Sequence, residues 1–325
     1  MGRYPFVCAY RRYLKNARAR LGESTIEERE RKLRLLSKIV QQLGDAERIG
    51  SPNPTLFTEE DVIEVFVALK QRRMKCSTLR KYLQMLKTVC RECGNRVVED
   101  MLAEGKIRVG NDISEPFSLD WEEMKEILEA CKRVGGWKGE ACRFSIAMLT
   151  FLRLRPGELR TASIRDLDIK KWTFLVANPK GKGRYGESKR LPIPDVLRPY
   201  VLDYLKARDS MLAGNGIKET MALIPAISRK GVGVYCQQAF GRLKDEVIKE
   251  AGIQFKWKDY RPTGGQLALD AGVPIDQVSR SMRHASTQTT ERYYCRVRAE
   301  PAFARVNEAY NMLSRPEPAI RAEND

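Results

Sequence analysis

The chain has 325 residues, of which 42% are hydrophobic, and 59 Lys and Arg against 42 Asp and Glu give a net charge of +17. This length favours two domains, and no apolar run approaches the roughly 20 residues of a membrane span, so no membrane-spanning helix is expected. The charge is spread through sequence that should fold, so it predicts a structured surface for a polyanion such as nucleic acid.

The first hundred residues predict a bundle of short helices. One helix is expected to end at Gly22, and a second follows the capping box Thr25-x-x-Glu28. After two prolines, Thr58 is a good N-cap for a third helix. These helices carry many basic residues, so the sequence predicts a small domain that grips DNA through its phosphates.

A fourth helix is predicted to begin at Ser77 and to bury an apolar stripe between Leu79 and Cys90. Six basic residues on it or just before it are candidate DNA contacts, the alternative being a solvated charged face. They are Arg72, Arg73, Lys75, Arg80, Lys81 and Lys87.

Eight cysteines are scattered along the chain, and only Cys90 and Cys93 form a CxxC pair. A tetrahedral zinc site would need two more ligands, and no second CxxC or histidine pair supplies them. We therefore expect reduced thiols, no metal and no cofactor.

A stretch rich in Gly, Asn, Asp and Pro predicts a boundary between two domains. We assign residues 1–108 to a helical DNA-binding domain, 109–117 to a linker and 118–325 to a catalytic domain. The capping box Asp120-x-x-Glu123 opens the first catalytic helix. Residues 140–152 are the most apolar segment and should form the core helix.

Two Arg-Pro steps, at Arg155-Pro156 and Arg261-Pro262, predict matching helix starts. Proline suits the first helical position, which would place each arginine at an N-cap. The free N–H groups and the dipole of a helix N-terminus attract phosphate, and an arginine adds a bidentate fork.

Residues 172–194 predict a β-hairpin whose Gly-rich tip carries Lys180 and Lys182. A lysine at such a tip can reach into a DNA groove. Two further helices are expected, over residues 195–212 and from Tyr235 to a stop at Gly252.

The stretch Lys256–Tyr294 holds the only histidine of the chain, His284, and it ends on Tyr293 and Tyr294. Tyr293 lies nine residues after His284 (293 − 284 = 9). With Lys258 and Arg261 upstream, this pattern is typical of half of a phosphoryl-transfer site in which a tyrosine attacks DNA.

Five segments, spread over roughly residues 150–300, resemble the motifs of the tyrosine recombinase or phage-integrase family. Leu154–Leu159 resembles G-L-R-x-S-E-L, and Lys180 resembles the hairpin lysine. Lys258–Arg261 resembles H-x-L-R, with lysine where histidine is usual. Met282–Ser286 resembles L-G-H-S-S, and Thr289–Tyr293 resembles T-T-x-x-Y.

The resemblance implies a mainly α-helical protein with a small β-hairpin or sheet, in which an N-terminal helical bundle precedes an α+β catalytic domain. It implies a site-specific recombinase or integrase of a mobile element that works through a 3′-phosphotyrosine and a Holliday junction. The family often lends a C-terminal helix, here Pro301–Leu313, to a neighbouring protomer, so a tetramer on double-stranded DNA is expected. Such a protein would be cytoplasmic and would join the nucleoid when bound to DNA.

The resemblance also assigns roles to the matched residues. Tyr293 would attack the scissile phosphodiester, while Arg155 and Arg261 hold its non-bridging oxygens. His284 would hydrogen-bond the phosphate or assist proton movement. Lys180 would protonate the leaving 5′-oxygen as general acid.

Several alternatives stay open at this stage. Lys182 competes with Lys180 for the hairpin role, Tyr294 competes with Tyr293, and the role of Lys258 is undecided. A type IB topoisomerase-like enzyme would use the same chemistry, and a non-catalytic DNA-binding protein could keep the fold. The complete set of candidate catalytic residues argues against the last alternative.

Overall fold

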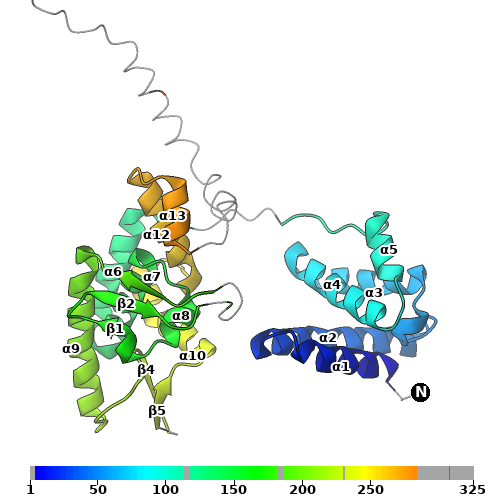
Figure 1. Ribbon diagram of the computed structural model, residues 1–325, viewed down its shortest axis with the longest axis horizontal. Helices are drawn as coiled ribbons and strands as arrows, with labels where there is room; N and C mark the ends of the chain where they lie inside the picture. The colour runs from blue at the N-terminus through cyan, green and yellow to red at the C-terminus, as the bar shows by residue number, and fades with distance from the viewer. Residues whose placement is uncertain are drawn as a thin grey trace, which may run out of the picture. The chain divides into compact units, whose positions relative to one another are not determined.

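The computed structural model describes residues 4–112, 118–179, 181, 186–229, 231–283 and 307 (Figure 1). The chain divides into two compact units, Met1–Ser114 and Glu115–Asp325. None of the described helices is long and apolar enough to cross a membrane. The mostly helical architecture, with small antiparallel sheets, confirms the predicted fold class.

The first unit is a bundle of helices around one apolar core, to which α2 contributes residues such as Leu33 and Leu36. Its elements are α1 (Pro5–Arg18), α2 (Glu23–Asp45), the 3₁₀ turn η1 (Pro54–Leu56), α3 (Glu59–Gln71), α4 (Cys76–Glu92) and α5 (Val97–Ala103). Thr58 caps α3 in a full capping box, as predicted.

Two predicted helix starts in this unit are wrong. α2 begins at Glu23, before the Thr25 capping box, and α4 begins at Cys76 rather than after Ser77. For α4 the reason is a cap from elsewhere in the chain. The carboxylate of Asp112 accepts the backbone N–H groups of Cys76 and Ser77, both at 2.7 Å. A distant carboxylate thus satisfies the helix N-terminus that Ser77 was predicted to cap.

The second unit surrounds the apolar helix α7 (Gly136–Phe151). Its other helices are α6 (Trp121–Val134), α8 (Pro156–Arg160), α9 (Arg198–Gly214), α10 (Gln237–Arg242), α11 (Asp245–Ala251), α12 (Tyr260–Asp270) and α13 (Ile275–Ser281). The 3₁₀ turns are η2 (Ile164–Asp166), η3 (Asp195–Leu197) and η4 (Trp257–Asp259). The prediction that residues 140–152 form the core helix is confirmed, because α7 is almost continuously buried from Ala141 to Thr150.

Two small antiparallel sheets complete the described part of this unit. The first has the order β1 (Leu167–Asp168), β2 (Thr173–Val176), β3 (Lys189–Pro192). The register runs from Thr173 opposite Pro192 to Val176 opposite Lys189, which confirms the predicted hairpin. The second sheet pairs β4 (Pro225–Ser228) with β5 (Gly231–Val234).

The helix predicted from Tyr235 to Ala251 is in fact two helices, α10 and α11. The backbone carbonyl of Phe240 accepts the indole N–H of Trp257 at 2.7 Å and the N–H of Leu243 at 3.3 Å. In a continuous helix that carbonyl would accept the N–H four residues further on. A tertiary contact therefore interrupts the helix where local sequence does not.

Candidate active site

Arg155 stands at the N-cap of α8, with extended backbone angles (φ −80°, ψ 144°) and Pro156 at the first helical position. This is the predicted placement. Glu158, in the first turn, accepts the backbone N–H of Arg155 at 2.9 Å and its Nη1 at 2.8 Å. The side chain of Glu158 is only 3% exposed, whereas that of Arg155 is 31% exposed. The buried carboxylate of Glu158 thus holds Arg155, whose side chain remains partly accessible to solvent.

Arg261 does not stand at a helix N-cap, so that prediction is wrong. α12 already begins at Tyr260, with Asp259 at its N-cap, and Pro262 fits inside the first turn because no N–H partner is required there. The helix starts early because the fully buried Tyr260 packs against Phe255, with ring centroids 5.3 Å apart. Arg261 itself is 8% exposed.

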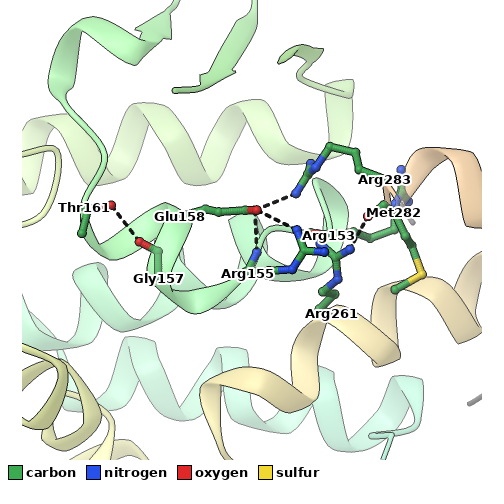
Figure 2. Close-up of polar contacts among 8 residues, drawn as sticks. All are labelled: Arg153, Arg155, Gly157, Glu158, Thr161, Arg261, Met282 and Arg283. Carbon is green, nitrogen blue, oxygen red and sulfur yellow. Dashed lines mark hydrogen bonds and ion pairs between the residues drawn. The ribbon is translucent and has the colours of Figure 1, made fainter. Parts of the chain in front are cut away.

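The guanidinium of Arg261 joins two segments that carry candidate motifs (Figure 2). Its Nη1 donates to the backbone carbonyl of Arg153, and its Nη2 donates to that of Met282. Arg153 lies two residues before Arg155, and Met282 lies two residues before His284. The start of α8, the first turn of α12 and the end of α13 therefore meet at one point.

Arg283 also reaches this point, immediately after α13. Its Nη2 contacts Glu158 Oε2 at 2.6 Å, and its side chain is 10% exposed (Figure 2). Its backbone is left-handed, with φ +57°. Burial lowers the pKa of Arg283, and the negative charge of Glu158 opposes that effect.

The sequence reasoning missed Glu158 and Arg283 as members of the site. The sequence could have indicated Glu158, because it belongs to the Arg-Pro-Gly-Glu-Leu segment that was identified for Arg155. Arg283 directly precedes the only histidine, but nothing local indicates that its partner lies 125 residues earlier.

Gly264 sets how closely α12 approaches the core helix. A Cβ atom at this position would lie 2.0 Å from the carbonyl oxygen of Thr150 and 2.9 Å from its carbonyl carbon. Only glycine fits this approach. α7 leads directly to Arg153 and Arg155, so this contact also sets the position of Arg261 relative to them.

Lys258 lies in the turn η4 and is exposed. Its neighbour Asp259 is buried, accepts the backbone N–H of Lys256 at 2.7 Å, and has a pKa that burial raises. The ammonium of Lys258 makes no salt bridge with any residue that the structure describes, so it can face an incoming anion.

Five of the predicted site residues fall outside the described ranges, as does the predicted C-terminal helix Pro301–Leu313 except for Asn307. The five are Lys180, Lys182, His284, Tyr293 and Tyr294. Arg155 and Arg261 are brought together in the described structure, and Lys258 lies in the turn η4 that directly precedes α12, the helix of Arg261.

A cavity of about 520 Å³ lies beside Arg283, between β3 and the end of α13. Among the described residues, its lining combines apolar side chains such as Phe151 and Leu191 with cations and contains no carboxylate. The cationic lining residues are Arg153, Lys189, Arg190, Arg280 and Arg283. The surface next to the site is therefore strongly attractive to anions.

The six candidate DNA contacts of the first unit differ in how free they are. Lys87 pairs with Glu99 at 2.9 Å, and Arg80 Nη2 donates to the carbonyl of Gly110 at 2.6 Å. The other four have exposed side chains that make no hydrogen bond or salt bridge within the described part of the chain. They are Arg72, Arg73, Lys75 and Lys81.

The cysteines of the described residues are all free thiols. Cys90 is buried, and burial raises the pKa of its thiol to about 12, which disfavours the thiolate that a metal would need. Within the same ranges, no group of three or more His, Cys, Asp or Glu side chains could hold a metal ion.

Comparison with known proteins places these features in a family. Residues 118–300 match the model of the phage integrase family. The tyrosine recombinase XerA of Pyrococcus furiosus is 24% identical over 259 residues, which are 79% of this chain and 83% of the relative.

Two solved structures share the fold. A Tn1549 transposon integrase in complex with a circular intermediate DNA has a TM-score of 0.68 at 16% identity, covering 94% of this chain and 99% of that one. A XerH site-specific recombinase bound to a palindromic difH substrate has a TM-score of 0.66 at 16% identity, covering 93% and 83%.

Proposed function

Because the chain belongs to the phage integrase family of tyrosine recombinases, which cleave and rejoin DNA, we propose that Tyr293 forms a 3′-phosphotyrosine with the scissile strand. The observation that carries this proposal is the meeting of three motif segments at Arg261. Its guanidinium ties the backbone before Arg155 to the backbone before His284. Groups that act on one phosphate must be held together in this way.

The chemistry is an in-line exchange of phosphate esters. The Tyr293 oxygen bonds to phosphorus, the bond from phosphorus to the 5′-oxygen breaks, and Lys180 gives that oxygen a proton. Tyrosine has an ordinary pKa of about 10, so it needs a proton acceptor, and we assign proton movement to His284. The 5′-hydroxyl of a partner strand then reverses the step. Because the phosphotyrosine keeps the energy of the ester bond, rejoining requires no nucleotide.

We assign phosphate binding to Arg155 and Arg261. Arg155 offers an accessible guanidinium at a helix N-cap, where the dipole of α8 adds positive potential. Arg261 is buried and anchored to two carbonyls, so its part in the site is to fix the geometry as well as to supply charge. Lys258 adds an exposed cation at the entrance to α12.

The test is a covalent adduct that survives SDS. Wild-type protein is incubated with a library of nicked duplexes of randomised sequence, and the trapped DNA identifies a working site. Tyr293→Phe should abolish the adduct, and Tyr294→Phe should retain it. Loss of the adduct with Tyr294→Phe alone would transfer the nucleophile to that residue, and loss with neither would exclude this mechanism.

The first unit is proposed to grip the duplex through its free cations. The relatives named above include an integrase and a recombinase that were solved with DNA. Lys75 and Lys81 are exposed and unpaired within the described residues, so we expect the double variant Lys75→Gln/Lys81→Gln to weaken DNA binding. Each lost phosphate contact should reduce the slope of log K against log salt by about 0.9.

Arg34→Gln is the matched control for that experiment, because Arg34 is an exposed cation of the same unit that already pairs with Glu30 at 2.6 Å. Fluorescence anisotropy over a salt series measures both variants. An equal loss of salt dependence in the control would mean that net charge, and not this surface, determines binding.

We also propose that the protein assembles as a tetramer on DNA and integrates or excises a mobile element in the cytoplasm. Light scattering of the protein with a trapped site measures the assembly, and a stable 1:1 complex through cleavage and exchange would contradict it. Direct repeats flanking the coding sequence in its genome would support integration.

A further inference from the structure

We propose that Arg283 is a positioning residue of the active site, acting on Arg155 through the buried carboxylate of Glu158. This inference rests on the recombinase chemistry proposed above. Arg155 contacts the carboxylate of Glu158, which competes with a DNA phosphate for the guanidinium, and Arg283 would limit that competition.

The three side chains form a cluster in which Arg155 and Arg283 share the carboxylate of Glu158 (Figure 2). Glu158 Oε1 accepts Arg155 Nη1 at 2.8 Å, and Glu158 Oε2 accepts Arg283 Nη2 at 2.6 Å. Each guanidinium thus holds one carboxylate oxygen. A free Arg–carboxylate pair would tend to form two parallel bonds. Oε2 accepts both Arg283 Nη2 and the backbone N–H of Arg155, the latter at 2.9 Å, and these two donors together block that arrangement.

The net charge of this cluster also supports a role of Arg283 in keeping Arg155 available for phosphate. One carboxylate between two guanidinium groups leaves a net charge of +1. Without Arg283, Glu158 and Arg155 would form a neutral pair, which attracts a phosphate less strongly. Exposure rises from Glu158 (3%) through Arg283 (10%) to Arg155 (31%), so the surplus positive charge is presented at Arg155.

Two features of Arg283 are unfavourable for stability. Its backbone has φ +57°, a region that glycine adopts freely and that other residues adopt with strain. Its Nε and Nη1 are buried with no hydrogen-bond partner among the described residues. Stability alone would favour glycine here. Strain of this kind is retained where it serves a site, which supports a role in positioning.

The first test is a double-mutant cycle on the rate of single-turnover cleavage, with a site trapped by the wild-type protein. Arg283→Gly should lower the rate about 10- to 100-fold, because Arg155 turns toward both oxygens of Glu158. Glu158→Gln should lower it as well. The rate of the double variant should agree with that of Arg283→Gly within about threefold. Both changes break the same connection, from Arg283 through Glu158 to Arg155.

Two further variants separate positioning from folding. Arg283→Lys keeps the charge and should recover part of the rate. Arg283→Gly relieves the left-handed backbone, so its thermal midpoint should not fall in proportion to its rate. Rates that multiply in the double variant would overturn the proposal and indicate that Arg283 contacts DNA directly. A fall in stability without a fall in rate would overturn it too.

A second measurement needs no cleavage. Nitrogen-15 NMR of the DNA-free full chain reports how fast the guanidinium protons of Arg155 exchange with water. Arg283→Gly should slow that exchange, because Arg155 gains a second carboxylate oxygen. Unchanged or faster exchange would refute the connection. If the wild type forms no adduct, the recombinase proposal fails, while this measurement still decides whether Arg283 positions Arg155.

Discussion

Replacing Gly264 by alanine should damage the catalytic unit more than its single added methyl group suggests. The new Cβ would lie 2.0 Å from the carbonyl oxygen of Thr150, whereas Cβ atoms essentially never come within 3.0 Å of such an atom. The obstacle is backbone, so a side-chain rotation cannot relieve it. α12 must move away from α7 by about 1 Å or more.

The stability cost follows from two opposing effects. Overpacking against a rigid neighbour costs about 3 kcal/mol, at the upper end of the usual range, while exchanging glycine for alanine within a helix contributes about 1 kcal/mol in the other direction. The net loss is therefore about 2 kcal/mol. In a unit of this size that lowers the thermal midpoint by roughly 4–8 °C.

The catalytic cost should exceed the stability cost. α12 carries Arg261, and α7 leads to Arg153 and Arg155, so the displacement separates groups that act on one phosphate. A misplacement of about 1 Å can cost roughly 100-fold in rate. Differential scanning fluorimetry measures the midpoint, and single-turnover cleavage at a temperature where both proteins are folded measures the rate.

Gly241→Ala is the matched control, because Gly241 also lies in a helix, α10, but a Cβ there would meet nothing within 4 Å. It should leave activity intact and raise the midpoint slightly. If Gly264→Ala kept the wild-type midpoint and rate, the close approach of α12 to α7 would not determine the geometry of the site.

Three further predictions concern single residues. The backbone N–H groups of Ser77 and Cys76 lower the pKa of Asp112 to about 2. The stabilisation of α4 by Asp112 should therefore be complete above the ordinary pKa of 3.8 and should be lost as the pH falls toward 2. Asp112→Asn should flatten that part of an acid titration followed by circular dichroism. Arg155→Lys should reduce single-turnover cleavage by about 10²- to 10³-fold, and a smaller change than tenfold would remove Arg155 from the phosphate site. Arg261→Lys should lower the free energy of unfolding by about 1–3 kcal/mol in urea, because one ammonium cannot reach two carbonyls; an unchanged urea midpoint would contradict the role of those contacts.

Local chemistry predicted those parts of the fold and the site that depend on neighbouring residues. Proline at position 156 fixes its own backbone angle, so the N-cap placement of Arg155 could be foreseen. The capping box at Asp120 and the apolar run of α7 are equally local, and both are observed.

The features that could not be predicted all depend on distant partners. Asp112 supplies the cap of α4 from 36 residues away, and the indole of Trp257 interrupts the helix after Phe240. Burial of Tyr260 moves the start of α12 and places Arg261 inside the helix. Spacing alone contains no information on such contacts, since they arise only when the unit that contains both partners folds.

The anchoring of Arg261 has a consequence for how this site can vary among relatives. Two of its contacts go to main-chain carbonyls, of Arg153 and Met282, and every amino acid has such a carbonyl. The side chains at these two positions can therefore change while the contact persists, provided that the backbone path is kept. Covariation between aligned sequences would leave this connection undetected, although it joins two of the motifs by which the family is recognised.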